Sequence, residues 1–243
     1  GTGPRQPNCD PRCIISIRPG WRAEQIAAAI DAIPVGFWGS DFLAAIGPGA
    51  AAPPYDFLAT RPPGQSLEGF LYPGTVELSN GDTPESFRDM LLAAFAANLP
   101  DGAEAAAAAH GLTFYQALAL ASIIQRESWA PGEQALVSSV FHNRLRAGSP
   151  LGATVTLQYA LGHPGDWWPR VRGSQINTAS PYNTNVNAGL PPSPIGNPSA
   201  DAIRAALYPA DANYLFFTGN CRGSGNLYAT TYEEHLANVN ACQ

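Results

Sequence analysis

Hydrophobic positions repeat with the spacing of an α-helix between residues 113 and 128. Leu120, Ile123, Ile124 and Glu127 fall at i, i+3, i+4 and i+7, so they share one face of that helix. Thr113 is a suitable N-terminal cap, and the run after it is rich in Ala, Leu and Gln, which favour helices. The pattern therefore predicts a helix that packs inward through an apolar face, with the carboxylate of Glu127 at the end of that face.

The rest of the chain alternates shorter helical and extended patterns. A β-branched run at 14–17 is followed, across a Pro-Gly turn, by a helical pattern at 21–33, which suits a small βα unit. Thr83 and Pro84 form a helix start, with a cap followed by a proline at the first helical position. Together the patterns predict an α+β fold with further helices at 40–46, 84–98, 103–110, 131–148, 197–207 and 231–239, and further strands at 76–78, 214–218 and 227–230.

Proline and glycine indicate the domain organisation. Residues 1–13 are polar and contain proline, which predicts a linker, and the cluster of Pro62, Pro63 and Gly64 predicts a soft boundary near 61–65. We therefore expect an N-terminal βα unit at 14–62 and a larger mixed α+β domain at 63–243.

Charge and composition exclude several classes of function. All 13 basic residues are Arg, so a P-loop lysine, a Schiff-base lysine and a Ser-Lys dyad are excluded. The net charge of −6, with scattered Arg, argues against nucleic acid as a partner. The chain has no run of 18 apolar residues, no signal peptide, no G-x-S-x-G and no strand followed by G-x-G-x-x-G.

The four cysteines predict disulfides rather than a metal site. No C-x-x-C pair is present and the four His are scattered, so we expect neither a metal nor a cofactor. We predict a bond between Cys221 and Cys242, and Cys9 with Cys13 is the complementary pair. An oxidising compartment follows from this reading, and free buried thiols are the alternative.

Residues 149–200 are rich in Gly, Pro, Asn, Thr and aromatics. Between residues 134 and 200 the only carboxylate is Asp166. Neutral hydrogen-bonding side chains beside aromatics fit a groove for a neutral, ring-bearing polymer such as a sugar chain. Aromatics stacked in a core would give the same pattern.

Glu127 is the strongest candidate for an acid catalyst. A carboxyl that is partly removed from water has its pKa raised, and a proton held near neutral pH is what general-acid catalysis needs. The alternative is a structural Glu that reaches solvent or pairs with a nearby Arg. A glycosidase would also need a second carboxylate, for which Glu68 and Asp166 are the candidates. One clear acid without a clear carboxylate nucleophile fits a reaction in which the substrate supplies its own nucleophile.

Six segments together resemble the endolytic murein transglycosylases of the YceG-like family, over roughly residues 14–240. They are Leu-Glu-Gly-Phe-Leu-Tyr-Pro-Gly-Thr at 67–75, Leu-Ala-Ser-Ile-Ile-Gln-Arg-Glu at 120–127, Ser-Val-Phe-His-Asn-Arg-Leu at 139–145, Ser-Pro-Tyr-Asn-Thr at 180–184, Gly-Leu-Pro-Pro-Ser-Pro-Ile at 189–195 and Ala-Ile-Arg-Ala-Ala-Leu-Tyr-Pro at 202–209.

The resemblance implies cleavage of the MurNAc–GlcNAc bond inside peptidoglycan strands, by attack of the sugar's own 6-hydroxyl, which leaves a 1,6-anhydro end. Glu127 matches the family's catalytic acid/base. The resemblance further implies a LysM-like N-terminal module, of which we expect this chain to keep only a remnant, the last part, beginning near Ile14. It also implies an upstream membrane anchor, extracytoplasmic action and cell-wall synthesis proteins as partners. The candidate substrate-binding residues that it implies are Glu68, Tyr72, Asn143, Arg144, Thr156, Tyr182, Asn183 and Thr184.

The chain departs from the family pattern at three positions. Where the family typically has Asp followed by Pro, this chain has Thr154 and Val155, and Asn226 stands where we would align a family His. The altered segment at Thr154 leaves open a rival, a non-catalytic peptidoglycan-binding scaffold. Among enzymes, the rival is a hydrolytic muramidase that uses Glu127 with Glu68 or Asp166.

Overall fold

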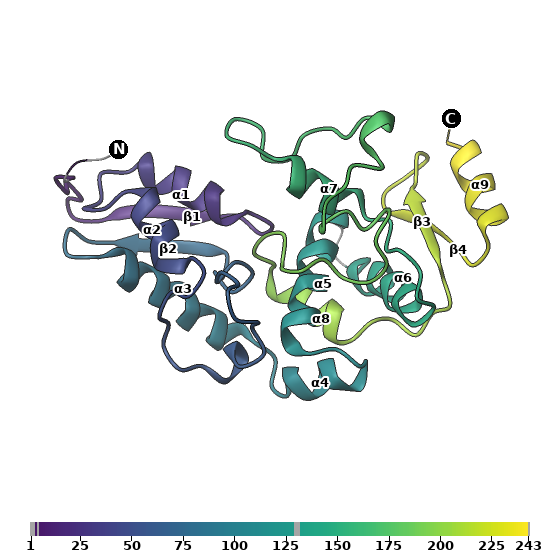
Figure 1. The fold of residues 1–243 in the computed structure, drawn as a ribbon, viewed down its shortest axis with the longest axis horizontal. Helices are drawn as coiled ribbons and strands as arrows, with labels where there is room; N and C mark the ends of the chain where they lie inside the picture. Colours follow the sequence, from purple (N-terminus) through teal and green to yellow (C-terminus); the bar gives the residue numbers. More distant parts are fainter. Residues whose placement is uncertain (1–2, 4, 129–131, 243) are drawn as a thin grey trace.

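A computed structural model describes residue 3, residues 5–128 and residues 132–242. The elements form two lobes (Figure 1), with β1, α1, α2, β2 and α3 in the first lobe and α4 to α9 with β3 and β4 in the second. Helices and small antiparallel sheets make up the regular structure, so the predicted α+β class is confirmed.

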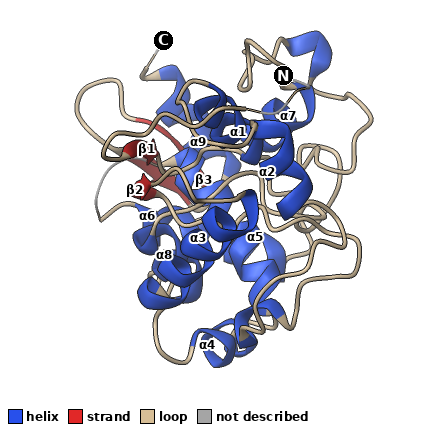
Figure 2. Cartoon of the chain, turned by 90° about the vertical axis from the view of Figure 1, so that its left-hand side faces the viewer, coloured by secondary structure: helices blue, strands red, loops and turns tan. Residues whose placement is uncertain are grey.

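A two-stranded sheet organises the first lobe. The strand β1 (Cys13–Ile17) pairs antiparallel with β2 (Gly74–Leu78), from Cys13 opposite Leu78 to Ile17 opposite Gly74. The helices α1 (Ala23–Asp31) and α2 (Gly39–Ile46) lie between the strands in sequence, and α3 (Pro84–Asn98) follows them. Figure 2 shows the two strands of this sheet in red. The sheet therefore joins the two sides of the boundary expected near residues 61–65. Whether this unit is LysM-like stays a prediction.

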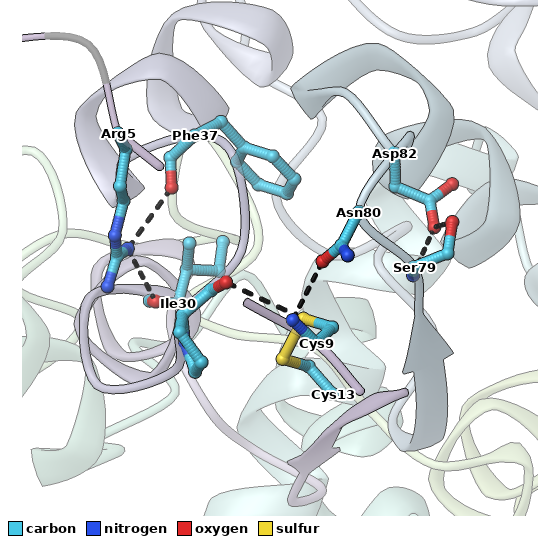
Figure 3. The surroundings of a disulfide bond; sticks show 9 residues. Arg5, Cys9, Cys13, Ile30, Phe37, Ser79, Asn80 and Asp82 are labelled. Carbon is cyan, nitrogen blue, oxygen red and sulfur yellow. Dashed lines mark hydrogen bonds between the residues drawn. A yellow bond between two sulfur atoms is a disulfide. The ribbon is translucent and has the colours of Figure 1, made fainter. Parts of the chain in front are cut away.

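Residues 5–12, which lie within the segment predicted as a linker, contact the first lobe. A disulfide joins Cys9 to Cys13, and the Cys9 N–H donates to Asn80 Oδ1 at 2.7 Å. Figure 3 shows the Arg5 guanidinium directed at the carbonyl oxygens of Ile30 and Phe37, at 3.1 and 3.2 Å. These contacts tie residues 5–13 to the lobe.

The helix α5 (Phe114–Glu127) is the central element of the second lobe. The Thr113 hydroxyl accepts from the Gln116 N–H at 3.2 Å, so the predicted cap is confirmed. Eleven of its residues are buried, on nearly every side and not only on the predicted apolar face. This is possible because its Ala and Ser side chains let α8 (Ala200–Leu207) and α6 (Gln134–Arg146) pack closely against it. The short helix α4 (Ala103–Ala109) precedes it.

The C-terminal part of the second lobe carries the other sheet. The strands β3 (Phe216–Gly219) and β4 (Asn226–Ala229) pair antiparallel, and α9 (Tyr232–Asn240) packs against them. The predicted disulfide between Cys221 and Cys242 is confirmed, and it fixes the end of α9 to the loop between the strands.

The main departure from the sequence-based expectation is α7 (Thr154–Leu161), which lies inside the segment taken as loop. Two 3₁₀ turns, η1 (Asp56–Leu58) and η2 (Gly173–Gln175), were also not expected. The predicted helix start at Pro131 lies outside the described residues. Among the residues that the structure describes, no single helix is long and apolar enough to cross a membrane; α4 and α5 reach that length only together, and they are bent by 85°.

Candidate active site

Glu127 is the last residue of α5, and its side chain is partly buried. Burial raises its pKa to about 7, and three groups oppose that rise: hydrogen bonding from the Val155 backbone N–H, and the charges of Arg126 and Arg144. Desolvation disfavours the carboxylate, while a donor and two cations favour it. Near neutral pH both the acid and the carboxylate are therefore populated.

The N-terminus of α7 faces this carboxyl. Val155 is the second residue of α7, so its N–H has no partner within the helix. The fully buried Thr156 and Thr184 hold this end in place: their hydroxyls lie 2.9 Å apart, and the Thr184 hydroxyl accepts from the Ala153 N–H at 3.2 Å. A free N–H and the positive end of a helix dipole both stabilise a carboxylate. The two threonines thus orient the group that binds Glu127.

Arg144 is a fixed cation beside Glu127. Its guanidinium donates to the carbonyl oxygens of Leu151 and Leu215, the latter at 2.7 Å, and it lies 5.2 Å from the centroid of the Phe216 ring. Gly152 allows this approach, because a Cβ there would lie 2.9 Å from the Arg144 Nη1. Both hydrogen bonds are to backbone carbonyl oxygens, so neither of them pairs the positive charge of Arg144 with a carboxylate.

Glu68 lies elsewhere, where the two lobes meet. We call this contact the seam; in it Arg22, Ala23 and Glu68 bond Tyr159 or each other. It is 4% exposed; one carboxylate oxygen accepts from the Ala23 N–H at 2.7 Å and the other from the Tyr159 hydroxyl. Burial, and then repulsion from Glu24, raise its pKa to about 7. Each oxygen accepts from a protein donor, so this acid is bonded within the protein, and its part in substrate binding stays a prediction. Asp166 is exposed in a turn with His163.

The remaining predicted residues fall into two groups. Asn143 and Asn183 are engaged internally: the Asn143 amide donates to the carbonyls of Ala212 and Tyr214, and the fully buried Asn183 donates to two carbonyls of its own loop. Tyr72 and Tyr182 are partly exposed, and the Tyr182 hydroxyl lies 2.7 Å from Ser193 Oγ. The structure thus brings Glu127, Arg144, Thr156 and Thr184 together, and it places Glu68 and Tyr182 around Tyr159.

Sequence reasoning missed four residues that shape these sites. Tyr159 and Arg22 meet across the seam between the lobes, and Val155 donates to Glu127. Glu133 accepts from both the backbone N–H and the amide of Asn226, at 2.8 and 2.9 Å. None of these carried a local signal, because each depends on a partner distant in sequence.

Within the described ranges, no group of three His, Cys, Asp or Glu residues is placed to hold an ion. A pocket of about 570 Å³, bordered by Gln125, Asp201 and Arg204, lies off the α5 face that carries Glu127, since positions two apart point to opposite sides of a helix.

Comparisons with known proteins point to one family. The sequence model of the YceG-like family matches residues 4–241, beginning ten residues earlier than the resemblance quoted above. A protein of Streptococcus pneumoniae serotype 2 named endolytic murein transglycosylase is 33% identical over 175 residues, which are 71% of this chain and 32% of that protein. A protein of the same name from Bacillus subtilis is 32% identical over 171 residues, 70% of this chain and 46% of that protein.

The chain therefore spans about a third to a half of the length of these relatives. Among solved structures, the crystal structure of a YceG-like protein from Listeria monocytogenes matches with a TM-score of 0.77 and 27% identity. That match covers 92% of this chain and 75% of the other.

Proposed function

The chain belongs to the YceG-like family, and from this membership and the geometry at Glu127 we propose that it is an endolytic lytic transglycosylase of peptidoglycan. It would cleave the β-1,4 bond between MurNAc and GlcNAc within glycan strands. The single observation that carries the proposal is the environment of Glu127, which holds the pKa of a partly buried carboxyl at about 7.

Such a carboxyl can act first as an acid and then as a base. The protonated Glu127 donates to the glycosidic oxygen as the bond to C1 of MurNAc breaks. The resulting carboxylate accepts the proton of the 6-hydroxyl, whose oxygen closes on C1 to give the 1,6-anhydro ring. The proton balance is closed and no water is consumed. The Val155 N–H and Arg144 support the carboxylate formed between the two transfers.

The hydrolytic alternative is less well supported. A hydrolase needs a second carboxylate about 5–5.5 Å away for retention or roughly 6.5–9.5 Å away for inversion. The two candidate carboxylates are engaged elsewhere: Glu68 accepts from the Ala23 N–H and the Tyr159 hydroxyl, and Asp166 is exposed in a turn with His163. Attack by a hydroxyl of the same sugar also benefits from proximity.

The predicted substrate-binding residues take different parts in this proposal. Tyr72 and Tyr182 are partly exposed and are the candidates for direct contact with sugar rings. Thr156, Thr184, Asn143 and Asn183 act by holding the walls of the site, since their polar groups are bonded within the protein. Thr156 and Thr184 bond each other, and the two asparagines bond backbone carbonyls.

Several wider expectations stay proposals. We infer extracytoplasmic action, which suits the two disulfides. A LysM-like character of the β1–α1–α2–β2 unit, an upstream membrane anchor and cell-wall synthesis partners are implied by the family resemblance.

The test is digestion of purified peptidoglycan followed by mass spectrometry of the released fragments. We expect muropeptides that end in 1,6-anhydroMurNAc, lighter by one water than hydrolytic products. Glu127→Gln should lose about 10²–10⁴-fold in rate, since the amide matches the carboxyl in shape but donates no acidic proton. Glu104→Gln, on the exposed face of α4, is the matched control and should keep full activity.

Three other outcomes would contradict this proposal, and two of them would support a rival function. Reducing-end MurNAc labelled from ¹⁸O-water would show a muramidase. Retained binding to sacculi with no new ends would show the scaffold, and near wild-type rates in Glu127→Gln would remove this residue from the reaction.

A further inference from the structure

Arg22 anchors the first lobe on the last turn of α7. It is 6% exposed, its Nη1 donates to the Tyr159 carbonyl at 2.9 Å, and its guanidinium lies 4.0 Å from the centroid of the Tyr159 ring. Gly162 comes so close that a Cβ there would lie 2.5 Å from the same nitrogen. The seam leaves little room for α7 to shift relative to α1.

Glu68 completes this anchor from the loop before β2. Its two oxygens accept from the Ala23 N–H, at the start of α1, and from the Tyr159 hydroxyl. A buried carboxyl that binds one donor from each lobe links those lobes directly. The proposed reaction gives it no proton to transfer.

The other end of α7 bears the N–H that binds Glu127. Val155 and Tyr159 are four residues apart, which is about one turn or 6 Å along the axis. A helix this short moves as a unit, so the position of Tyr159 fixes the position of the Val155 N–H. The hydrogen bond between Thr156 and Thr184 then limits the remaining movement of the N-terminus of α7.

We propose that Glu68 is a positioning residue for the acid at Glu127: its hydrogen bond with Tyr159 holds α7 where the Val155 N–H meets the Glu127 carboxyl. The assignment rests on the proposed function, because Glu127 is the acid of that reaction. Burying the Glu68 carboxyl in the seam costs free energy, and a positioning role accounts for its presence there.

Different charged groups surround Glu127 and Glu68, so an effect transmitted through α7 can be told apart from a direct change of charge beside Glu127. Glu127 faces Arg126 on α5, Arg144 on α6 and the amide of Val155 on α7. Glu68 faces Glu24 and Arg22 on α1 and Tyr159 on α7. Replacing Tyr159 by Phe alters none of the charges beside Glu127, so a change in the pKa of Glu127 would report the displacement of α7.

The experiment measures the pKa of Glu127 directly, by ¹³C NMR titration of protein labelled at the glutamate side-chain carboxyl carbon, with Glu127→Gln to assign the signal. Val155→Pro removes the N–H at a position of the first helical turn where proline is tolerated. It should raise the pKa of Glu127 by about one unit, because the carboxylate loses a donor. Tyr159→Phe should raise it by about half a unit.

The double variant tests the route. If Tyr159 acts through Val155, then adding Tyr159→Phe to Val155→Pro should shift the pKa no further. The alkaline limb of the pH dependence of kcat/KM should move upward with the pKa, which a merely structural role would not cause. Tyr55→Phe, whose ring stacks on Phe57 at 4.8 Å in the first lobe, is the matched control and should leave the pKa unchanged.

Two results would overturn the inference: an unchanged pKa in a folded Tyr159→Phe variant, or additive shifts in the double variant. Either can occur while the wild-type protein still releases anhydro products, in which case the proposed function stands. The absence of anhydro products from the wild-type protein would refute the proposed function whatever the pKa values.

Discussion

Glu127→Gln should remove a pH dependence of stability that the wild-type protein carries. Burial raises the pKa of Glu127 from 4.5 to about 7, so the folded protein holds this proton more tightly than the unfolded chain. The stability that the proton contributes is fully present below about pH 4.5 and is lost as the pH rises through about 7.

The size of the effect follows from the shift. At about 1.36 kcal/mol for each tenfold change in proton affinity, the rise in the pKa of Glu127 amounts to roughly 3 kcal/mol in all. Most of this, about 2–3 kcal/mol, falls between about pH 5 and about pH 8, since the unfolded carboxyl is already mostly ionised at the lower pH. The neutral amide of the Glu127→Gln variant does not titrate, so this variant lacks that pH dependence of stability. Glu68, with its own raised pKa, contributes equally to both proteins and cancels.

The assay is urea unfolding of both proteins at the two pH values, followed by circular dichroism. The stability of Glu127→Gln relative to wild type should increase by about 2–3 kcal/mol from the lower to the higher pH, or by roughly 5–10 °C in Tm. Glu104→Gln should show no such increase, because that carboxylate is exposed. Parallel pH profiles for wild type and Glu127→Gln would refute a pKa near 7 for Glu127.

Two further substitutions test the fold. Gly69→Ala should cost about 3 kcal/mol in urea unfolding, because φ is +96° there and a Cβ would lie 2.6 Å from Pro194 Cγ; the same change at Gly81, where nothing lies within 4 Å of a Cβ, should cost less than about 0.5 kcal/mol. Replacing Cys221 and Cys242 by Ser should cost about 3 kcal/mol, since the bond closes a loop with a sequence separation of 21 residues; equal stability with and without reductant in the wild-type protein would contradict this.

Elements with local start signals were predicted well from the sequence. Thr113 and Thr83 each cap a helix through a side chain that accepts from a backbone N–H three residues later, and Pro84 stands at the first helical position. These signals lie within one turn of the helix they begin, so they can be read without knowledge of the fold.

The helix α7 gave no such signal. Ala153, its N-terminal cap residue, has no side-chain oxygen, and the helix is held instead by Thr184, about thirty residues away. Its sequence, with two threonines and a Gly before it, has weak helix propensity on its own. Tertiary contacts decide the structure here, which is why the segment reads as loop.

The roles of individual residues were hardest to predict where partners are distant. Glu68 bonds Tyr159 across 91 positions, and Gly69 and Leu71 both donate to Asn197 from more than 120 positions away. A motif therefore indicated that the segment at 67–75 matters, but not whether its acid faces substrate or the interior.

Glu68 and Glu127 both have raised pKa values but differ in their hydrogen bonds and in their exposure to solvent. Burial brings both Glu68 and Glu127 to a pKa of about 7, so that value alone does not distinguish them. Glu68 has both oxygens bound to protein donors and is 4% exposed, so a proton on it has no route to a substrate. Glu127 keeps partial exposure. Because proton transfer requires the acid to reach hydrogen-bonding distance of the reacting oxygen, the proposed acid role is given to Glu127, and the role proposed for Glu68 is to fix the helix whose N-terminus faces Glu127.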